Sequence, residues 1–295
     1  MTISMEDTES RTRSAERPQI VDAELVPVQP IGRHLVRRSR ARLVAPFLVL
    51  GAVLTAWALA SATLFDERQR FLLPPPQDVV RVGFLDTDNL SELLHGLWST
   101  TKVALVGLTL SLVIGVLLAI VMSQASWVRH SIYPYAVVLQ TIPILAVVPL
   151  LGFWFGFDFR SRVIVCVLVS LFPIITNTLF GLQSVDHDLH DLFSLHRASR
   201  WQRLVRLQLP AALPSIMTGL KIAAGLSVIG AIIADFFFRQ GEPGIGRLID
   251  MYRQRLASEQ LLSALLLSSF VGLLIFWACD LLASRVDRAR TGRRR

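Results

Sequence analysis

The sequence predicts an all-α protein: a polytopic membrane helical bundle of about six transmembrane helices, with one further helix in a polar loop. Two observations support this fold class. Hydrophobic residues make up 53% of the 295 residues. They are gathered in runs of about 20, which is long enough to cross a ~30 Å hydrocarbon layer as a helix. A soluble domain interrupts its apolar residues with polar ones in every helical turn instead.

The chain begins with a polar tail, residues 1–42, that has too few large apolar residues to bury a core. We expect this tail to be disordered and cytoplasmic. The first apolar segment is longer than the apolar region of a cleaved signal peptide, so it is predicted to remain as a span. Residues 286–295 form a basic tail after the last span. The predicted spans are Leu43–Leu64, Thr101–Met122, Tyr135–Phe155, Val163–Gly181, Ile216–Phe237 and Leu261–Leu282.

Arginine is distributed unevenly between the loops. The loops on the N-terminal side carry Arg129, then four arginines within residues 197–206, then a cluster in residues 285–295, whereas the opposite loops are nearly balanced or acidic. Since Lys and Arg are enriched on the cytoplasmic side, both termini and the loop at 186–216 are predicted to be cytoplasmic. This bias accounts for the net charge of +8. No motif that reads DNA or RNA accompanies it, so nucleic-acid binding is not expected.

Prolines mark two kinds of irregular segment. The connector Leu72–Pro76 contains three consecutive prolines, which fix φ and donate no hydrogen bond, so it is predicted to be extended and outside the membrane. Residues 89–100 are predicted to form a short amphipathic helix before the second span. Within the spans, Pro143, Pro149 and Pro173 free backbone carbonyls that a membrane tolerates only inside protein or beside water. This pattern favours a bundle that lines a pathway.

The fifth predicted span combines small residues with one carboxylate. Small side chains let helix backbones approach closely in lipid, either within one chain or between two copies. Near the outer end, Asp235 is expected either to face a water-filled vestibule or to pair with Arg239, one turn later. The small residues at helical spacing are Gly219, Ala223, Ser227 and Ala231.

The loop Asp186–Ile216 is the segment most suited to a soluble partner. Its acidic residues come early and its arginines late, which suits a helix dipole. The spacing predicts a short helix near residues 188–201, lying across the membrane face with one stripe available to a partner groove. Pro210 and Pro214 are predicted to end the loop and begin the next span. The stripe consists of Leu189, Leu192, Phe193 and His196.

No motif in the chain supports catalysis or nucleotide binding. The sequence contains neither the phosphate-binding pattern G-x-x-x-x-G-K-[ST] nor H-E-x-x-H. His187 and His190 have no cysteine nearby and are predicted to be solvated rather than metal ligands. We therefore expect no catalytic residue, metal or cofactor in this chain.

The segment from Asp191 to Pro214 resembles the cytoplasmic loop of binding-protein-dependent ABC importer permeases. That family's pattern runs Glu-Ala-Ala, three residues, Gly, about nine residues, an apolar residue and then Leu-Pro. Asp191 stands at the Glu position, Leu192 and Phe193 at the Ala positions, and Arg197 at the Gly position. The end, Ala198–Gln202 with Leu209–Pro214, fits closely, whereas the front half departs from the pattern.

The resemblance extends over most of residues 70–285, and it is to the nitrate, sulfonate and taurine branch. Most members of that branch carry Glu at the position of Asp235. Importers for thiamine-pyrimidine precursors and riboflavin share the branch, so the substrate does not follow. The matching segments are residues 139–143, 149–150, 154–157, 172–178 and 241–246.

The resemblance implies a transmembrane permease domain at residues 43–285, with a core at 90–285, in the plasma membrane of a prokaryote. Two copies, or this chain and a paralogue, would form the pathway. A separate ATPase would bind ATP and Mg and dock on the loop at 186–214. An extracellular binding protein would dock on residues 239–260 and the proline connector. The substrate would be a small organic anion such as a sulfonate, taurine or nitrate, or a pyrimidine- or riboflavin-type vitamin precursor.

Individual residues receive roles from the same resemblance. Asp191 would begin the coupling segment, with Arg197 and Arg200 as charges at its rim. Predicted ATPase contacts are Leu192, Phe193, Ala198, Ser199 and Trp201. Predicted pathway residues, assigned from position alone, are Gln140, Thr141, Asn177 and Asp235.

The main alternative is a self-sufficient secondary transporter or channel. Such a protein needs buried ionisable residues to couple ions, and it usually has an internal repeat. The predicted spans hold almost no charge near the middle of the membrane, and no repeat is visible. An intramembrane enzyme is a second alternative, and the chain offers no catalytic pair for it.

Overall fold

The computed structural model describes residues 40–64, 66, 69, 71–238 and 240–292, and within them every regular element is helical. The predicted tail 1–42 therefore lies outside the described residues, except for its last three. In the following list η marks a π-helical turn. The elements are α1 (Arg40–Thr63), α2 (Pro76–Val80), η1 (Arg81–Leu85), α3 (Thr87–Gln124), α4 (Ser126–Thr141), α5 (Ile144–Phe155), α6 (Phe159–Gln183), α7 (His187–Leu195), α8 (Arg200–Arg203), η2 (Leu204–Gln208), α9 (Leu209–Phe237), α10 (Ile245–Gln254) and α11 (Ser258–Gly292).

The predicted membrane fold is confirmed. Among the described residues, five helical segments are long and apolar enough to cross a membrane, and the pair α4–α5 brings the number to six if it counts as one span. The prediction that Tyr135–Phe155 forms a single helix was wrong, because α4 and α5 meet at an angle of 100°. Ile142 and Pro143 at the break are extended. Proline disfavours helical geometry in the residue before it, which explains the break.

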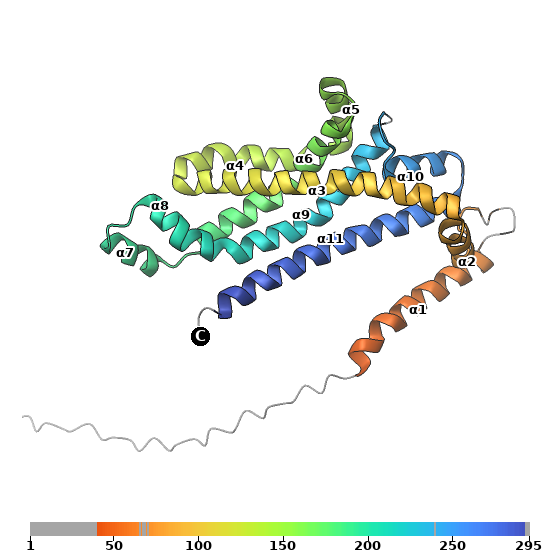
Figure 1. The fold of residues 1–295 in the computed structure, drawn as a ribbon, viewed down its shortest axis with the longest axis horizontal. Coiled ribbons are helices and arrows are strands. Elements are labelled where there is room, and N and C mark those ends of the chain that lie inside the picture. The colour runs from red at the N-terminus through yellow and green to blue at the C-terminus, as the bar shows by residue number, and fades with distance from the viewer. Residues whose placement is uncertain (1–39, 65, 67–68, 70, 239, 293–295) are drawn as a thin grey trace, which may run out of the picture. The chain divides into compact units, whose positions relative to one another are not determined.

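Four long helices, α3, α6, α9 and α11, make the core of the bundle, and α6 and α9 have the most extensive contact (Figure 1). The small residues predicted on the fifth span are all buried within this chain, so they serve packing inside the bundle. A Cβ atom added to Gly219 would lie 2.9 Å from the carbonyl oxygen of Pro173 on α6. Such close backbone approach is what small residues permit in membrane helices.

Two different structures occupy the two ends of this bundle. At one end, α7 and α8 connect α6 to α9; at the other, α10 follows α9 and packs on α3 and α11 (Figure 1). Leu93 of α3 and Leu248 and Tyr252 of α10 are buried together in this second contact. We call the first the connector end and the second the α10 end.

The segment before α3 differs in part from its prediction. Residues 89–100 are not a separate helix, because α3 runs unbroken from Thr87, where the Asp86 side chain accepts hydrogen bonds from the backbone of Asp88 and Asn89. The predicted extended connector is only partly so: Leu72 lies in a turn and Leu73 in a bend, Pro75 is extended, and Pro76 already begins α2. Proline is tolerated in a first helical turn because the N–H it lacks would be unpaired there.

Candidate functional site

The connector between α6 and α9 consists of two short helices joined by a sharp turn. α7 ends at Leu195, so the prediction of one helix through residue 201 was wrong. The N–H of Ala198 donates to the carbonyl of Phe193 at 3.0 Å, and that of Arg197 donates to Ser194 at 2.9 Å. This pair of bonds is the Schellman pattern, which ends a helix by placing one residue in the left-handed region.

Arg197 is that left-handed residue, with φ of 50°. Its position is the one at which the importer-permease pattern has glycine. A residue with a Cβ pays about 1–2 kcal/mol for this conformation, whereas glycine adopts it freely. The departure at Arg197 therefore leaves the turn itself intact and adds conformational strain.

The second helix of the connector starts immediately after the turn. Ser199 caps α8: its hydroxyl accepts from the N–H of Gln202 at 3.2 Å, and the Gln202 side chain accepts from the N–H of Ser199 at 2.9 Å. This reciprocal capping box satisfies two otherwise unpaired donors. Arg203 of α8 also donates to the Ser194 hydroxyl of α7 at 2.9 Å. Both helices are thereby held in one defined arrangement.

A groove of about 400 Å³ lies between the two helices of the connector. Two predicted contact residues, Trp201 and Leu192, are 71% and 47% exposed. Leu195 was not predicted, although it is 80% exposed. The predicted residues Asp191, Ser199 and Arg200 are exposed but lie outside the groove. The groove is lined by Leu192, Phe193, His196, Ala198, Gln202 and Arg206.

His190 of α7 is partly buried. Partial burial lowers the pKa of His190 below its ordinary value, and the nearby positive charge of Arg203 lowers it further. Both effects favour the neutral form of the imidazole.

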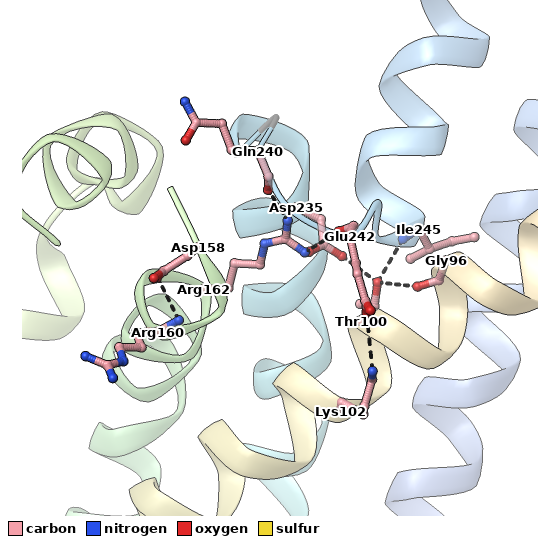
Figure 2. A network of polar contacts seen from close by, with 10 residues as sticks. All are labelled: Gly96, Thr100, Lys102, Asp158, Arg160, Arg162, Asp235, Gln240, Glu242 and Ile245. Carbon is pink, nitrogen blue, oxygen red and sulfur yellow. Dashed lines mark hydrogen bonds and ion pairs between the residues drawn. The ribbon is translucent and has the colours of Figure 1, made fainter. Parts of the chain in front are cut away.

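At the α10 end, a buried ion pair joins α6 to α9 (Figure 2). Nη1 of Arg162 donates to Oδ1 of Asp235 at 3.1 Å, and the two side chains are 4% and 0% exposed. Arg162 also donates to the carbonyls of Glu242 at 3.0 Å and Gln240 at 2.8 Å. A single guanidinium thus holds α9 and the segment that follows it.

The other oxygen of Asp235 is bound by the neighbouring helices. The Thr100 hydroxyl of α3 donates to Oδ2, and it accepts from the N–H of Ile245, the first residue of α10, at 2.8 Å. The N–H of Gly246 also donates to this carboxylate. Placing a carboxylate at the first turn of α10 suits the helix dipole. We call Thr100, Arg162, Asp235 and the first turn of α10 the Asp235 cluster (Figure 2).

The expectation that Asp235 faces a vestibule was wrong for this conformation, because the carboxylate is fully buried and enclosed by α3, α6 and α10. Its other predicted partner, Arg239, lies outside the described residues. The sequence analysis did not single out Arg162, because the predicted span began at Val163. The sequence signal for this ion pair was an arginine at the edge of one apolar segment together with an aspartate in another.

Two glycines at the start of α10 are required by this cluster. A Cβ at Gly244 would lie 1.9 Å from Oδ2 of Asp235, and one at Gly246 would lie 2.2 Å from the carbonyl oxygen of Ile232. Real Cβ atoms do not come this close to another heavy atom. The segment Gly241–Gly246, singled out in the sequence, is therefore the part of the backbone that packs directly on Asp235.

Comparison with known proteins decides the family. The model for the binding-protein-dependent transport system inner membrane component matches residues 111–289, more than half of the chain. The chain belongs to this family. It is an ABC importer permease, a multi-pass membrane protein of the branch that includes sulfonate and nitrate permeases.

Relatives and a solved structure agree with this assignment. The chain is 37% identical to the formylaminopyrimidine transport permease protein ThiX of Halalkalibacterium halodurans, over 65% of this chain and 74% of ThiX. It is 28% identical to the putative aliphatic sulfonates transport permease protein SsuC of Escherichia coli, over 86% and 92% of the two chains. A structure of the MetNI methionine ABC transporter matches the fold with a TM-score of 0.59, at 16% identity, over 68% of this chain and 99% of that one.

In this permease the four predicted pathway residues lie at three different places. Gln140 and Thr141 are exposed at the end of α4, beside the break before α5. Asn177 on α6 donates to the carbonyl of Pro173 at 2.8 Å, and Asp235 belongs to its own cluster. No hydrogen bond within the described part of the chain joins any two of the four.

Proposed function

We propose that the connector is the surface through which this permease is coupled to a separate ATPase subunit. The observation that carries the proposal is its combination of exposed apolar side chains with a rigid backbone. Trp201 and Leu195 are mostly exposed although they lie in a polar segment between two spans. Aromatic residues of this kind are typical anchors in protein interfaces. ATP and Mg would be bound by the ATPase, and this chain would carry no catalytic residue.

A continuous helical segment joins the connector to the Asp235 cluster. α8, η2 and α9 follow one another without a gap from Arg200 to Phe237, 38 residues in all. At a rise of 1.5 Å per residue, this helical segment is roughly 57 Å long. Its far end carries Asp235. A tilt imposed on α8 by a closing ATPase pair would therefore move the Asp235 cluster and α10 at the opposite end.

The remaining partners follow from this orientation. With the arginine-rich connector end in the cytoplasm, the α10 end faces outward and would receive substrate from an extracellular binding protein. Both termini would be cytoplasmic, in the plasma membrane of a prokaryote. A second permease copy, identical or paralogous, would complete a pathway that includes Gln140, Thr141 and Asn177.

The relatives named for aliphatic sulfonates and for formylaminopyrimidine support a small organic anion or a pyrimidine-type precursor as the substrate.

Ala198 is the residue that tests coupling. It is half-buried, lines the groove and is the third residue after the end of α7. Replacing it with Glu puts a charge in the groove, whereas the matched control Ala198→Ser keeps a small side chain. With the partner ATPase and binding protein in proteoliposomes, we expect Ala198→Glu to reduce ATP-dependent uptake at least tenfold. Membrane insertion and the amount of permease should be unchanged.

Two results would contradict the proposal. One is wild-type uptake by Ala198→Glu; the other is transport by the purified permease alone, as expected of a secondary transporter. Co-purification provides a direct readout, since the ATPase should be retained by the wild type and Ala198→Ser but not by Ala198→Glu. Uptake measured with alkyl sulfonates, nitrate, taurine and aminopyrimidines would then identify the substrate class.

A further inference from the structure

A second hollow, of about 380 Å³, lies between α4 and α6 at the connector end. α4 begins there and α6 ends there, so the lining residues all fall within about two turns of these helix ends. That depth corresponds to the interface between headgroups and hydrocarbon in a membrane. The hollow is lined by Arg129, His130, Tyr133, Pro134, Thr176, Leu179, Phe180 and Gln183.

The polar groups of this hollow are mainly donors without partners. Within the described part of the chain, the side chains of Arg129, Tyr133 and Gln183 make no hydrogen bond or ion pair. Nδ1 of His130 lies 2.6 Å from the carbonyl oxygen of Ser126. Since a carbonyl only accepts, Nδ1 carries the proton and donates, and Nε2 is left unpaired.

No acidic residue offsets the charge of Arg129 nearby in the chain. The sequence contains no Asp or Glu between Glu92 and Asp158, or between Asp158 and Asp186. These intervals include all of α4 and α6 except the cap of α6. A half-buried guanidinium with an unshared charge is a strong site for an anion, because hydrogen bonds to a charged acceptor are about twice as strong as neutral ones.

Part of the wall of the hollow is apolar. Phe180, which is 69% exposed, and Leu179 contribute apolar surface from α6, and Pro134 contributes it from α4. An inorganic anion would leave this wall in contact with water. A ligand with an apolar part would cover it and would gain about 25 cal/mol for each Å² of apolar surface removed from water.

We propose that this hollow binds an amphipathic anion, with its charged group on Arg129 and its apolar part against Phe180 and Leu179. Two sources share this chemistry: the headgroup and chain of an anionic phospholipid, and a free organic anion such as an alkyl sulfonate. Basic pockets between transmembrane helices are known to hold anionic headgroups. The volume falls within the range of ordinary small-molecule sites. The site is independent of ATPase coupling and of the orientation in the membrane.

The test uses the full-length permease in nanodiscs of neutral phosphatidylcholine. Phosphatidylglycerol is titrated in one arm and octanesulfonate in the other, and bound molecules are counted by native mass spectrometry. In Arg129→Gln we expect affinity for the anion to fall about tenfold, the usual effect of losing one charge-assisted hydrogen bond. The matched control is Arg285→Gln, an exposed arginine near the end of α11 outside the hollow, which should bind as the wild type does.

The arms separate the two sources. Arg129-dependent binding of phosphatidylglycerol alone identifies a lipid site; Arg129-dependent binding of octanesulfonate identifies a site for free anions. Arg129→Lys keeps the charge and should recover most of the affinity, which excludes misfolding as the cause of the loss. Equal affinity of the wild type and Arg129→Gln for both anions, or equal affinity for anionic and neutral lipid, would overturn the proposal.

Discussion

Arg162 of α6 and Asp235 of α9 form an ion pair at 3.1 Å in which neither side chain is more than 4% exposed. The pair is supported by the Thr100 hydroxyl and by two backbone carbonyls, so nearly all of its hydrogen-bonding groups are used. Within the pair, Nε of Arg162 is buried and has no hydrogen-bond partner in the described part of the chain. This arrangement joins three membrane helices to the start of α10, and it is the basis of the first two predictions.

Removing one partner of this pair should be far more damaging than removing both. Asp235→Leu leaves a buried guanidinium without its counter-charge, and Arg162→Met leaves a buried carboxylate without its own. Each single change should lower the free energy of unfolding by about 3–5 kcal/mol. The double variant should recover much of that loss, since apolar residues can replace a buried pair. Thermal unfolding of the purified permease in detergent measures all three; equal losses in single and double variants would refute the account.

Gly244 should tolerate no side chain. Alanine there puts a Cβ 1.9 Å from Oδ2 of Asp235, so the first turn of α10 must move away from the carboxylate. We expect Gly244→Ala to destabilise the permease and to reduce binding-protein-dependent uptake.

The matched control for that variant is Gly225→Ala. Gly225 lies within α9, and an added Cβ meets no atom of this chain within 4 Å. Alanine should stabilise the helix by about 0.5–1 kcal/mol. If both alanine variants unfold at the same temperature, close packing on Asp235 is not the reason for the glycine.

Arg197→Gly should stabilise the connector. Glycine removes about 1–2 kcal/mol of left-handed strain, and its freedom in the unfolded chain offsets about 0.5–1 kcal/mol of that gain. The net increase should be about 0.5 kcal/mol and confined to residues 187–203, where hydrogen exchange should slow. Arg197→Ala removes the same charge but keeps the Cβ, so it should not slow exchange. Faster exchange in Arg197→Gly would show that the arginine side chain holds the turn.

Tyr252 should make stability depend on alkaline pH. Its hydroxyl lies 3.1 Å from both Asn89 Oδ1 and Glu92 Oε2. Burial and the neighbouring Glu92 carboxylate raise the pKa of Tyr252. Above about pH 10 the unfolded chain loses the phenol proton while the folded chain keeps it, so the free energy of unfolding falls as pH rises there.

The chain contains three tyrosines, and the measurement compares variants of two of them. Tyr252→Phe should flatten the fall in stability between about pH 9 and about pH 11. Tyr135→Phe, which changes an exposed side chain, should leave the slope unchanged. If the phenolate absorbance titration of Tyr252→Phe lacks an ionisation near pH 10 that the wild type shows, the pKa of Tyr252 is not raised and the prediction is wrong.

The sequence by itself determined the membrane class, the approximate spans and the family, because hydrophobic runs and motif order are local properties of a chain. It also predicted a helix within residues 188–201 from the spacing of Leu192, Phe193 and His196. The sequence predicted the ends of the helices less well. The left-handed turn at Arg197 and the bend at Pro143 each depend on a few backbone angles that several sequences can adopt or avoid.

Only the tertiary structure decided the partner of Asp235 and the role of the glycines around it. Arg162 and Asp235 are 73 residues apart, and nothing local to either residue specifies the other. The same holds for the hollow at Arg129, which two helices build together. A buried charge must be satisfied by whatever the packed helices bring within reach. That pairing is a property of the assembled bundle, and it appears only when α3, α6, α9 and α10 meet.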